Sequence, residues 1–303
     1  MLFDSRLIVV YCLVIGFLSG TANAAYPENF IMVEQLEAAV IVDGSFGEWP
    51  ATEASNNNHH NISEPHTIPS YVSNPQEMKY NKGWNPDPKI RAGVFDKTLY
   101  MSVTWKDEKP DELYRPWQNM GKHWRRGRKK DDMFAARFEL NGELAACMLS
   151  GQTYSVDVWR WSAGRSNVEG YADDMTHKFS TEFQEKSAVY THDGKSIYIT
   201  TNIDQGTRGW SFTRKPKKSE GDIKTGVTYQ TPSGSLADVK AKGVWKDGQW
   251  TLELSRPLKT SDVEDAVFYS GLKINAQFAF FNAGYRLRKQ ITNSILFDFE
   301  NIR

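Results

Sequence analysis

Short stretches in which apolar and polar residues alternate recur along the chain, whereas long runs with helical spacing of apolar residues are nearly absent. Alternation rich in β-branched and aromatic residues predicts strands with one buried face. The stretches that we expect to form strands are residues 38–42, 89–95, 99–105, 133–140, 154–161, 187–190, 196–201, 243–245, 249–254, 274–281 and 295–299. The pattern predicts an all-β fold, specifically an antiparallel β-sandwich, immunoglobulin-like or jelly-roll-like, with long loops.

Two pairs of these strands are joined by sequences typical of tight turns. Asp193-Gly194 separates residues 187–190 from 196–201, and Asp247-Gly248 separates residues 243–245 from 249–254. Asp-Gly suits such turns because their central positions require positive φ angles. We therefore predict a β-hairpin at each of the two places.

Three polar segments interrupt the alternating pattern. Residues 56–85 are rich in Asn, His, Pro and Ser, residues 106–130 mix Pro, Trp and basic residues, and residues 206–238 are rich in Gly, Lys, Ser and Thr. Loops of this length in a compact domain are usually functional or mobile. No segment has the composition of a clean linker, so we expect one β-sandwich domain over residues 25–303.

The first 24 residues have the features of a secretory signal peptide. Arg6 precedes an apolar run over residues 7–18, and Ala22-Asn23-Ala24 supplies the small residues of a cleavage site. We therefore expect residues 1–24 to be removed and the protein to be periplasmic or otherwise exported. The apolar run is short for a bilayer and no later run approaches the required length, so we expect no membrane span.

Cysteine content and charge exclude several classes of protein. Cys147 is the only cysteine after the signal peptide, so the mature chain has no internal disulfide, and C-x-x-C-H for covalent haem attachment does not occur. Lys plus Arg equals Asp plus Glu at 37 each, which disfavours strong nucleic-acid binding. The chain also lacks G-x-S-x-G, a P-loop and H-E-x-x-H, the motifs of common hydrolases and metalloproteases.

Several motifs resemble those of a known family. Residues 43–50, DGSFGEWP, are similar to the opening of the carbohydrate-binding family 9-like sandwiches. The segments KKDDMFAARFEL (129–140), VDVWRWSAGRSNVEGYADD (156–174), GVWKDGQWTLELSRPLKTSD (243–262) and FAFFNAGYRLRK (278–289) follow in order. This series resembles the haem-binding domain of the γ subunits of ethylbenzene dehydrogenase, dimethylsulfide dehydrogenase and relatives, the cytochrome c-552/DMSO reductase-like haem-binding domain.

The resemblance implies a non-covalent b-type haem held by a Met and a Lys. It assigns these iron ligands to Met148, which precedes the V-x-x-W-x-W-like segment, and to Lys289, which precedes the last strand in a polar connection between two apolar runs. Met133 is the alternative sulfur ligand, and Trp159 and Trp161 are expected to line the cofactor. His123 and His177 are spare candidates for an axial position. Two protein ligands would leave the iron without an open position.

The same resemblance implies the functional class and the partners. We expect an electron-transfer protein or subunit without catalytic residues of its own, working beside molybdopterin and iron–sulfur subunits of a periplasmic oxidoreductase. The basic run over residues 122–130, KHWRRGRKK, is interpreted as a docking patch for an acidic redox partner, a source of Arg contacts to haem propionates, or a solvated loop.

Two other functions remain open at this point. A carbohydrate-binding module-like protein would show Trp105, Trp124, Trp159 and Trp161 as a flat outward platform for sugar rings. A family member that has lost its cofactor would keep only the sandwich. Two departures from the family's usual motifs raise this alternative. Met148 is not followed by the usual Gly, and residues 285–288 before Lys289 lack the usual glycine-rich stretch.

A calcium site is a further candidate. Asp173 and Asp174, together with Asp157 or Glu169, supply the carboxylates that calcium prefers. No spaced ligand loop is evident, so the pattern favours a turn at Asp173-Asp174.

Overall fold

The computed structural model describes residues 30–50, 66–68, 70–71, 83–145, 148, 151–192, 194–217, 221–283 and 288–303. The expected signal peptide therefore lies outside the described residues. Within the described ranges, the regular structure is β-strand apart from two 3-10 helices, Ser166–Glu169 and Ser235–Ala237. This confirms the all-β fold class. The same ranges contain no helix long and apolar enough to cross a membrane.

The larger sheet has ten strands in the order β1-β23-β21-β9-β10-β11-β13-β12, with β22 paired to β21 and β4 paired to β22. Its pairs are antiparallel except β1 with β23. The strands are β1 (Phe30–Met32), β4 (Ser70–Tyr71), β9 (Met133–Asn141), β10 (Tyr154–Ser162), β11 (Asp173–Ser180), β12 (Ala188–His192), β13 (Lys195–Ile203), β21 (Lys273–Asn282), β22 (Arg288–Thr292) and β23 (Ile295–Asp298).

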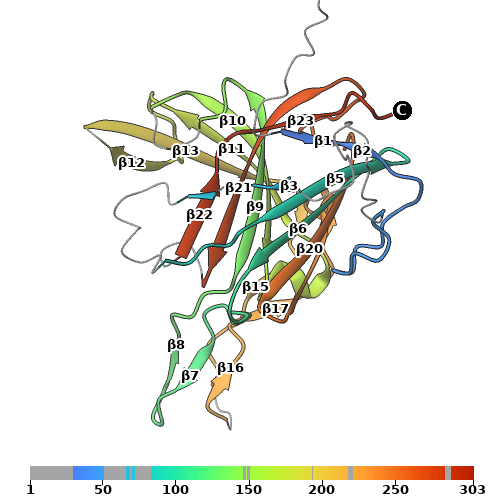
Figure 1. The fold of residues 1–303 in the computed structure, drawn as a ribbon. Coiled ribbons are helices and arrows are strands. Elements are labelled where there is room, and N and C mark those ends of the chain that lie inside the picture. The colour runs from blue at the N-terminus through green and yellow to red at the C-terminus, as the bar shows by residue number, and fades with distance from the viewer. Residues whose placement is uncertain are drawn as a thin grey trace, which may run out of the picture.

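The second sheet has six strands in the order β19-β20-β6-β5-β2, with β3 paired to β5. Its strands are β2 (Glu34–Gln35), β3 (His66–Thr67), β5 (Lys89–Phe95), β6 (Thr98–Lys106), β19 (Lys240–Lys246) and β20 (Gln249–Pro257). In Figure 1 this sheet lies across β9 and β21 of the larger sheet. Residues of both sheets form one buried apolar cluster, so the two sheets make the predicted sandwich.

Aromatic side chains fill the space between the two sheets. The indole of Trp105 on β6 has four aromatic neighbours, with ring centroids 5.7–6.2 Å away, and it is fully buried. These neighbours are Phe134, Trp161, Trp250 and Phe280. Rings in such tilted and T-shaped contacts exclude water and leave little free volume. The middle of the sandwich is therefore a packed hydrophobic core.

The long segments over residues 106–130 and 206–238 form small sheets of their own. Strands β7 (Trp117–Asn119), β8 (Trp124–Arg126) and β16 (Ile223–Lys224) make a three-stranded sheet. Two further pairs join β14 (Gly206–Thr207) to β18 (Ser233–Gly234) and β15 (Trp210–Phe212) to β17 (Val227–Tyr229). Figure 1 shows β7, β8 and β16 projecting away from the sandwich, and we call residues 115–130 together with 213–226 the projecting arm.

The structure also corrects three local predictions. Residues 38–42 are not a strand, and the chain instead forms β1 and β2 before them, each pairing in parallel. Asp173-Asp174 is not a turn, because these residues begin β11. Lys289 lies within β22 and not in a connection. The predicted turn at Asp247-Gly248 is confirmed, with φ angles of 51° and 84°.

The DGSFGEWP motif forms a turn held by a buried carboxylate of β20. Glu253 accepts hydrogen bonds from the backbone N–H groups of Asp43 and Gly44 at 3.1 and 2.9 Å. Its other oxygen accepts from Trp49 Nε1 at 2.8 Å. The motif therefore attaches the first described segment to the six-stranded sheet, which is a structural role.

Candidate cofactor-binding face

Strand register places Lys289 on one particular face of the ten-stranded sheet. Lys289 on β22 is opposite Phe281 on β21, and Phe281 is opposite Met133 on β9. Directly opposed residues point to the same face, and successive residues along a strand alternate between faces. Phe134 and Phe280, the neighbours of Met133 and Phe281, belong to the core between the sheets. Lys289 therefore lies on the other side, which we call the outer face.

The two predicted cofactor-lining tryptophans lie on the core side of the same sheet. Trp159 and Trp161 on β10 are fully buried, and Trp161 is opposite Phe134. The indole N–H of Trp161 donates to Asn167 Oδ1 at 3.0 Å. The structure thus does not bring these tryptophans together with Lys289, because the sheet separates them.

The connection between β9 and β10, which contains Met148, begins on the outer face. Arg137 on β9 donates from Nη2 to the carbonyl oxygen of Ala145 at 2.8 Å and from Nη1 to the hydroxyl of Tyr154 at 3.3 Å. Leu144 and Ala145 pack in a buried apolar cluster with residues of β10 and β11. Met148 follows three residues later, within about 11 Å of chain from Ala145, and is 39% exposed. Leu144 and Ala145, at the start of the connection that contains Met148, therefore lie on the same side of the sheet as Lys289.

Met133 differs from Met148 in its surroundings. It is buried, and its sulfur accepts a hydrogen bond from Arg165 Nη2 at 2.7 Å. Arg165 is itself paired with Asp131, with 2.9 Å between Nε and Oδ2. Met133 and Lys289 also extend from the same face of the sheet, with Phe281 of β21 between them, so they do not oppose one another.

Small side chains lie between these groups on the outer face. Ala135 on β9 is opposite Ala279 on β21, and both are partly exposed. Next to Ala135, Arg160 of β10 makes an ion pair with Asp173 at 2.9 Å. The two alanines thus form a region of short side chains on the outer face, which we call the low region. Longer side chains lie beside it, among them Arg160 and Phe281.

His177 belongs to the same face, since it is opposite Val156, which packs in the outer apolar cluster. Burial, together with the positive charges of Arg160 and Arg137, lowers the pKa of His177 to about 4. The imidazole is therefore neutral at neutral pH. His123, the other spare candidate, lies in the turn between β7 and β8 of the projecting arm, where its backbone carbonyl accepts from Met120 N–H.

The tryptophans named for sugar stacking do not form an outward platform. Trp105, Trp159 and Trp161 are fully buried, and Trp124 is 7% exposed. An open hollow lies elsewhere, at the end of β5 and β6. It is lined by Gly83, Trp84, Asn85, Asp87, Lys106, Asp107, Glu108, Asp247, Gly248 and Gln249, and it contains none of the predicted iron ligands.

Comparison with known protein families gives a direct assignment. The family model described as ethylbenzene dehydrogenase matches residues 65–290, a range that includes β9, β10, β11 and β21. The chain belongs to the ethylbenzene dehydrogenase family. The resemblance found in the sequence motifs is therefore confirmed at the family level, and Met148 and Lys289 both fall within the matched residues. No curated protein matches the chain.

Solved structures with a similar arrangement of strands include a carbohydrate-binding module of family 9 from Caldicellulosiruptor kristjanssonii. Its complex with glucose shares 9% identity, with a TM-score of 0.36, over 91% of this chain and 96% of that chain. Its complex with cellotriose also shares 9% identity, with a TM-score of 0.37, over 89% and 94%. These values describe a general likeness of fold, and the sugars belong to that protein.

Sequence reasoning missed the polar groups that organise the outer face. Arg137, which is 9% exposed, donates to Gln277 Oε1 from Nε at 2.7 Å, and Gln277 in turn donates to the carbonyl of Thr292. These bonds link β9, β21 and the end of β22. In the sequence Arg137 is only an arginine on a strand of alternating pattern, and the pattern does not show what it contacts. Its partner Gln277 becomes evident only from the register of β9 with β21.

Proposed function

We propose that this protein is an exported, b-type haem-binding electron-transfer subunit that resembles the γ subunits of its family, with haem on the outer face and Met148 and Lys289 as iron ligands. The supporting observation is that Lys289 and Ala145, three residues before Met148, lie on the same side of the ten-stranded sheet. The low region at Ala135 and Ala279 lies on that side too. The packed aromatic core argues against a porphyrin between the sheets.

The donor set suits electron transfer. A thioether is a soft neutral ligand that favours reduced iron, and an amine binds iron only as the neutral base. When bound, such a haem would exchange single electrons, since both axial positions would be taken by the protein. In this proposal Trp159 and Trp161 hold β10 from the core side, and Arg160, which pairs with Asp173, places a positive charge beside the haem propionates.

Haem titration of the purified mature chain tests the proposal. We expect one haem per chain and sharp α and β bands in the reduced-minus-oxidised spectrum. Lys289→Ala should shift these bands and lower haem affinity by about tenfold or more. Lys246→Ala, which removes an exposed lysine of β19, is the matched control and should leave both unchanged.

A parallel pair separates the two sulfur candidates. Met148→Ala should alter the spectrum and lower the reduction potential, because loss of the thioether disfavours reduced iron. Met133→Leu keeps apolar volume at a buried site and should leave the spectrum unchanged. An unaltered spectrum in both Lys289→Ala and Met148→Ala would reject the ligand assignment, and absence of stoichiometric haem would reject the function.

The proposed export also predicts the first residue of the mature protein. N-terminal sequencing of the exported protein should begin at Ala25.

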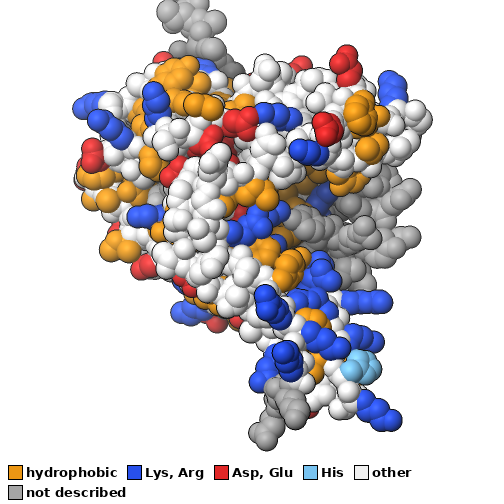
Figure 2. All heavy atoms as spheres, turned by 180° about the vertical axis from the view of Figure 1, so that it is seen from behind, with side chains coloured by type: hydrophobic (Ala, Val, Ile, Leu, Met, Phe, Trp, Pro, Cys, Tyr) orange, Lys and Arg blue, Asp and Glu red, His pale blue; other side chains and the backbone are white. Residues whose placement is uncertain are grey.

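A redox partner with an acidic surface fits the projecting arm. Its exposed basic residues outnumber the exposed acidic ones in the described part of the arm, where the acidic one is Asp222. The exposed basic residues are Lys122, Arg125, Arg128, Lys129, Arg214, Lys215, Lys217 and Lys224. Figure 2 shows Lys and Arg side chains gathered on this part of the surface. Such a concentration in a neutral protein favours docking to an acidic protein, in keeping with a subunit of a molybdoenzyme complex.

A further inference from the structure

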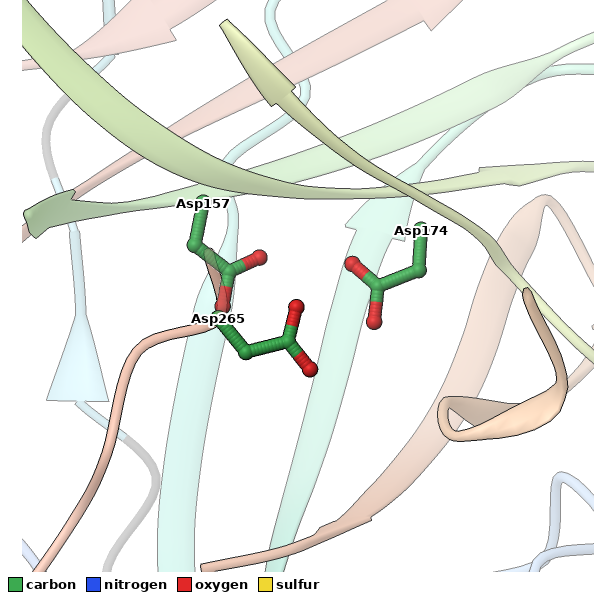
Figure 3. A group of neighbouring side chains, drawn as sticks. All are labelled: Asp157, Asp174 and Asp265. Atoms are coloured by element: carbon green, nitrogen blue, oxygen red, sulfur yellow. The ribbon is translucent and has the colours of Figure 1, made fainter. Parts of the chain in front are cut away.

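Three aspartates from separate segments meet inside the sandwich, away from the outer face. Asp157 on β10 and Asp174 on β11 lie on the core side of the sheet, and Asp265 comes from the connection between β20 and β21. One carboxylate oxygen of each lies within 4.8 Å of the others, and all three residues are buried. Figure 3 shows the carboxylate of Asp265 between those of Asp157 and Asp174.

One guanidinium faces these three carboxylates. Arg256 on β20 is fully buried, and its Nη1 lies 2.6 Å from Asp157 Oδ2, 3.6 Å from Asp265 Oδ2 and 4.0 Å from Asp174 Oδ2. Its Nη2 also donates to the carbonyl oxygen of Ala266, and the guanidinium contacts the rings of Trp159 and Phe268, all of which are neutral. With all groups ionised, the cluster therefore has three negative charges and one positive charge in a water-poor environment, where excess charge is costly.

Hydrogen bonds do not compensate for the excess. Asp157 Oδ2 accepts from Arg256 and from the Ala266 N–H, but Asp157 Oδ1 is buried without a hydrogen-bond donor. Asp174 Oδ2, on a residue with no exposed surface, likewise has no donor. Carboxylate oxygens in native interiors almost always receive donors, so two such oxygens at one place require another partner.

We propose that Asp157, Asp174 and Asp265 bind one divalent cation, with calcium as the expected ion. A divalent cation balances the net charge of minus two that remains beside Arg256. The ligand set consists of carboxylate oxygens, which hard cations prefer, and it contains no thiolate or imidazole for zinc or copper. Three separate segments would be joined by the ion, so it would stabilise the folded chain.

Asp204 extends the cluster at the end of β13. Its backbone N–H donates to the carbonyl oxygen of Asp174 at 3.4 Å, and its Oδ2 is buried without a donor. Burial, together with the negative charges of Asp265, Asp262 and Asp157, raises the pKa of Asp204 to about 7. Asp204 is thus an additional buried carboxylate beside the cluster.

Protons are the competing partner for the excess charge. Burial, followed by the charge of Asp157, raises the pKa of Asp174 well above its ordinary value, and burial raises that of Asp265 to about 6. If protons alone neutralise the cluster, calcium has no effect on stability, and removing one carboxylate relieves repulsion. If a cation neutralises the cluster, calcium stabilises the chain, and removing one carboxylate abolishes calcium binding. The effect of calcium on stability therefore separates the two cases.

The test uses the mature chain after treatment with EDTA, near neutral pH, without added haem. We expect calcium to bind with one-to-one stoichiometry in calorimetric titration and to raise the melting temperature by roughly 5 °C at saturation. Asp174→Asn, which keeps the shape but removes one charge, should abolish both effects. Asp298→Asn, at a buried aspartate paired with Lys273, is the control and should retain both.

Asp265→Asn lies in a connection and provides a second variant should Asp174→Asn not fold. The proposal is overturned if calcium neither binds nor changes the melting temperature of the wild-type chain. It is also overturned if calcium stabilises Asp174→Asn and Asp265→Asn as much as the wild type. Because haem is absent from both arms, neither result depends on the proposed electron-transfer function.

Discussion

Buried carboxylates in this protein differ in how many donors surround them. Glu253 accepts three N–H hydrogen bonds at the DGSFGEWP turn, and Asp132 accepts from Asp111 N–H, Trp250 Nε1 and Ala283 N–H. Asp157 and Asp174, by contrast, each keep one oxygen without a donor. Donors within the protein satisfy the carboxylate oxygens of the first kind, whereas the second kind leaves two buried oxygens without a donor.

The pH dependence of stability follows from these residues. Asp265 and Asp204 have pKa values raised from 3.8 to about 6 and about 7, and that of Asp174 is raised as well, with the positive charge of Arg256 acting in the opposite direction. These carboxyls therefore keep protons in the folded chain at pH values where the unfolded chain has lost them. Without metal, stability should fall as the pH rises from about 4 to about 7, by about 1.4 kcal/mol per pH unit for each such proton.

Denaturant midpoints measured in EDTA across this pH range check the expectation. Asp174→Asn should flatten the decline because it removes one of the titrating groups. A midpoint that rises with pH, with the same slope in Asp174→Asn, would contradict this account of the cluster.

At the scale of elements, alternation along strands was predictable and pairing between them was not. Residues 89–95 form β5 with the predicted bounds, and residues 249–254 and 274–281 lie inside β20 and β21. Local alternation contains this information. The face on which Lys289 and Trp161 lie depends on the register of β22, β21, β9 and β10, and the pairing of β21 with β9 joins residues more than a hundred positions apart.

The candidate sites show the same division. Family motifs indicated Met148, Lys289 and the family itself, whereas the separation of Lys289 from Trp159 required the sheet. Asp157 and Asp174 were noticed as acidic residues, but Asp265 lies about ninety positions beyond Asp174 and enters the cluster only through the fold. A turn was predicted at Asp173-Asp174 because no spaced ligand loop follows them, whereas these two residues begin β11, and their buried carboxylates have partners that only the fold supplies.

Strand β19 offers a test of how tightly the two sheets pack. Gly243 faces the ring of Trp161, and a Cβ at this position would lie 2.4 Å from that ring. Gly243→Ala should therefore lower the free energy of unfolding by about 1–3 kcal/mol. Gly47→Ala, whose Cβ would lie 3.9 Å from Ser45 Oγ, is the matched control and should change stability little. Equal midpoints for both variants in chemical denaturation would show that the sheets adjust easily.

For the whole molecule, three functions are assigned to separate regions. The outer face is proposed for haem, the interior aspartate cluster for a cation, and the projecting arm for a partner. The sheet lies between the first two, and Figure 1 shows the arm extending from the sandwich. Variants in one region should therefore leave the measured property of the others unchanged.

The arm should control association with the partner subunits through charge. Replacing Lys122, Arg125 and Lys224 with Glu should slow association by about tenfold or more at low salt. The same number of Glu replacements at Lys97, Lys186 and Lys246, which are exposed elsewhere, is the control. Stopped-flow electron transfer with the purified partner subunits measures the rate. The difference between the two triple variants should vanish at high salt, and a difference that persists there would exclude an electrostatic cause.

The reduced-minus-oxidised spectrum of the protein purified from an exporting cell, without added haem, tests the central claim most directly. The account predicts sharp bands from one non-covalent haem per chain, and it predicts that Lys289→Ala changes those bands while Lys246→Ala does not. A folded, exported protein that contains no haem, or whose haem spectrum is the same in Lys289→Ala, would contradict it.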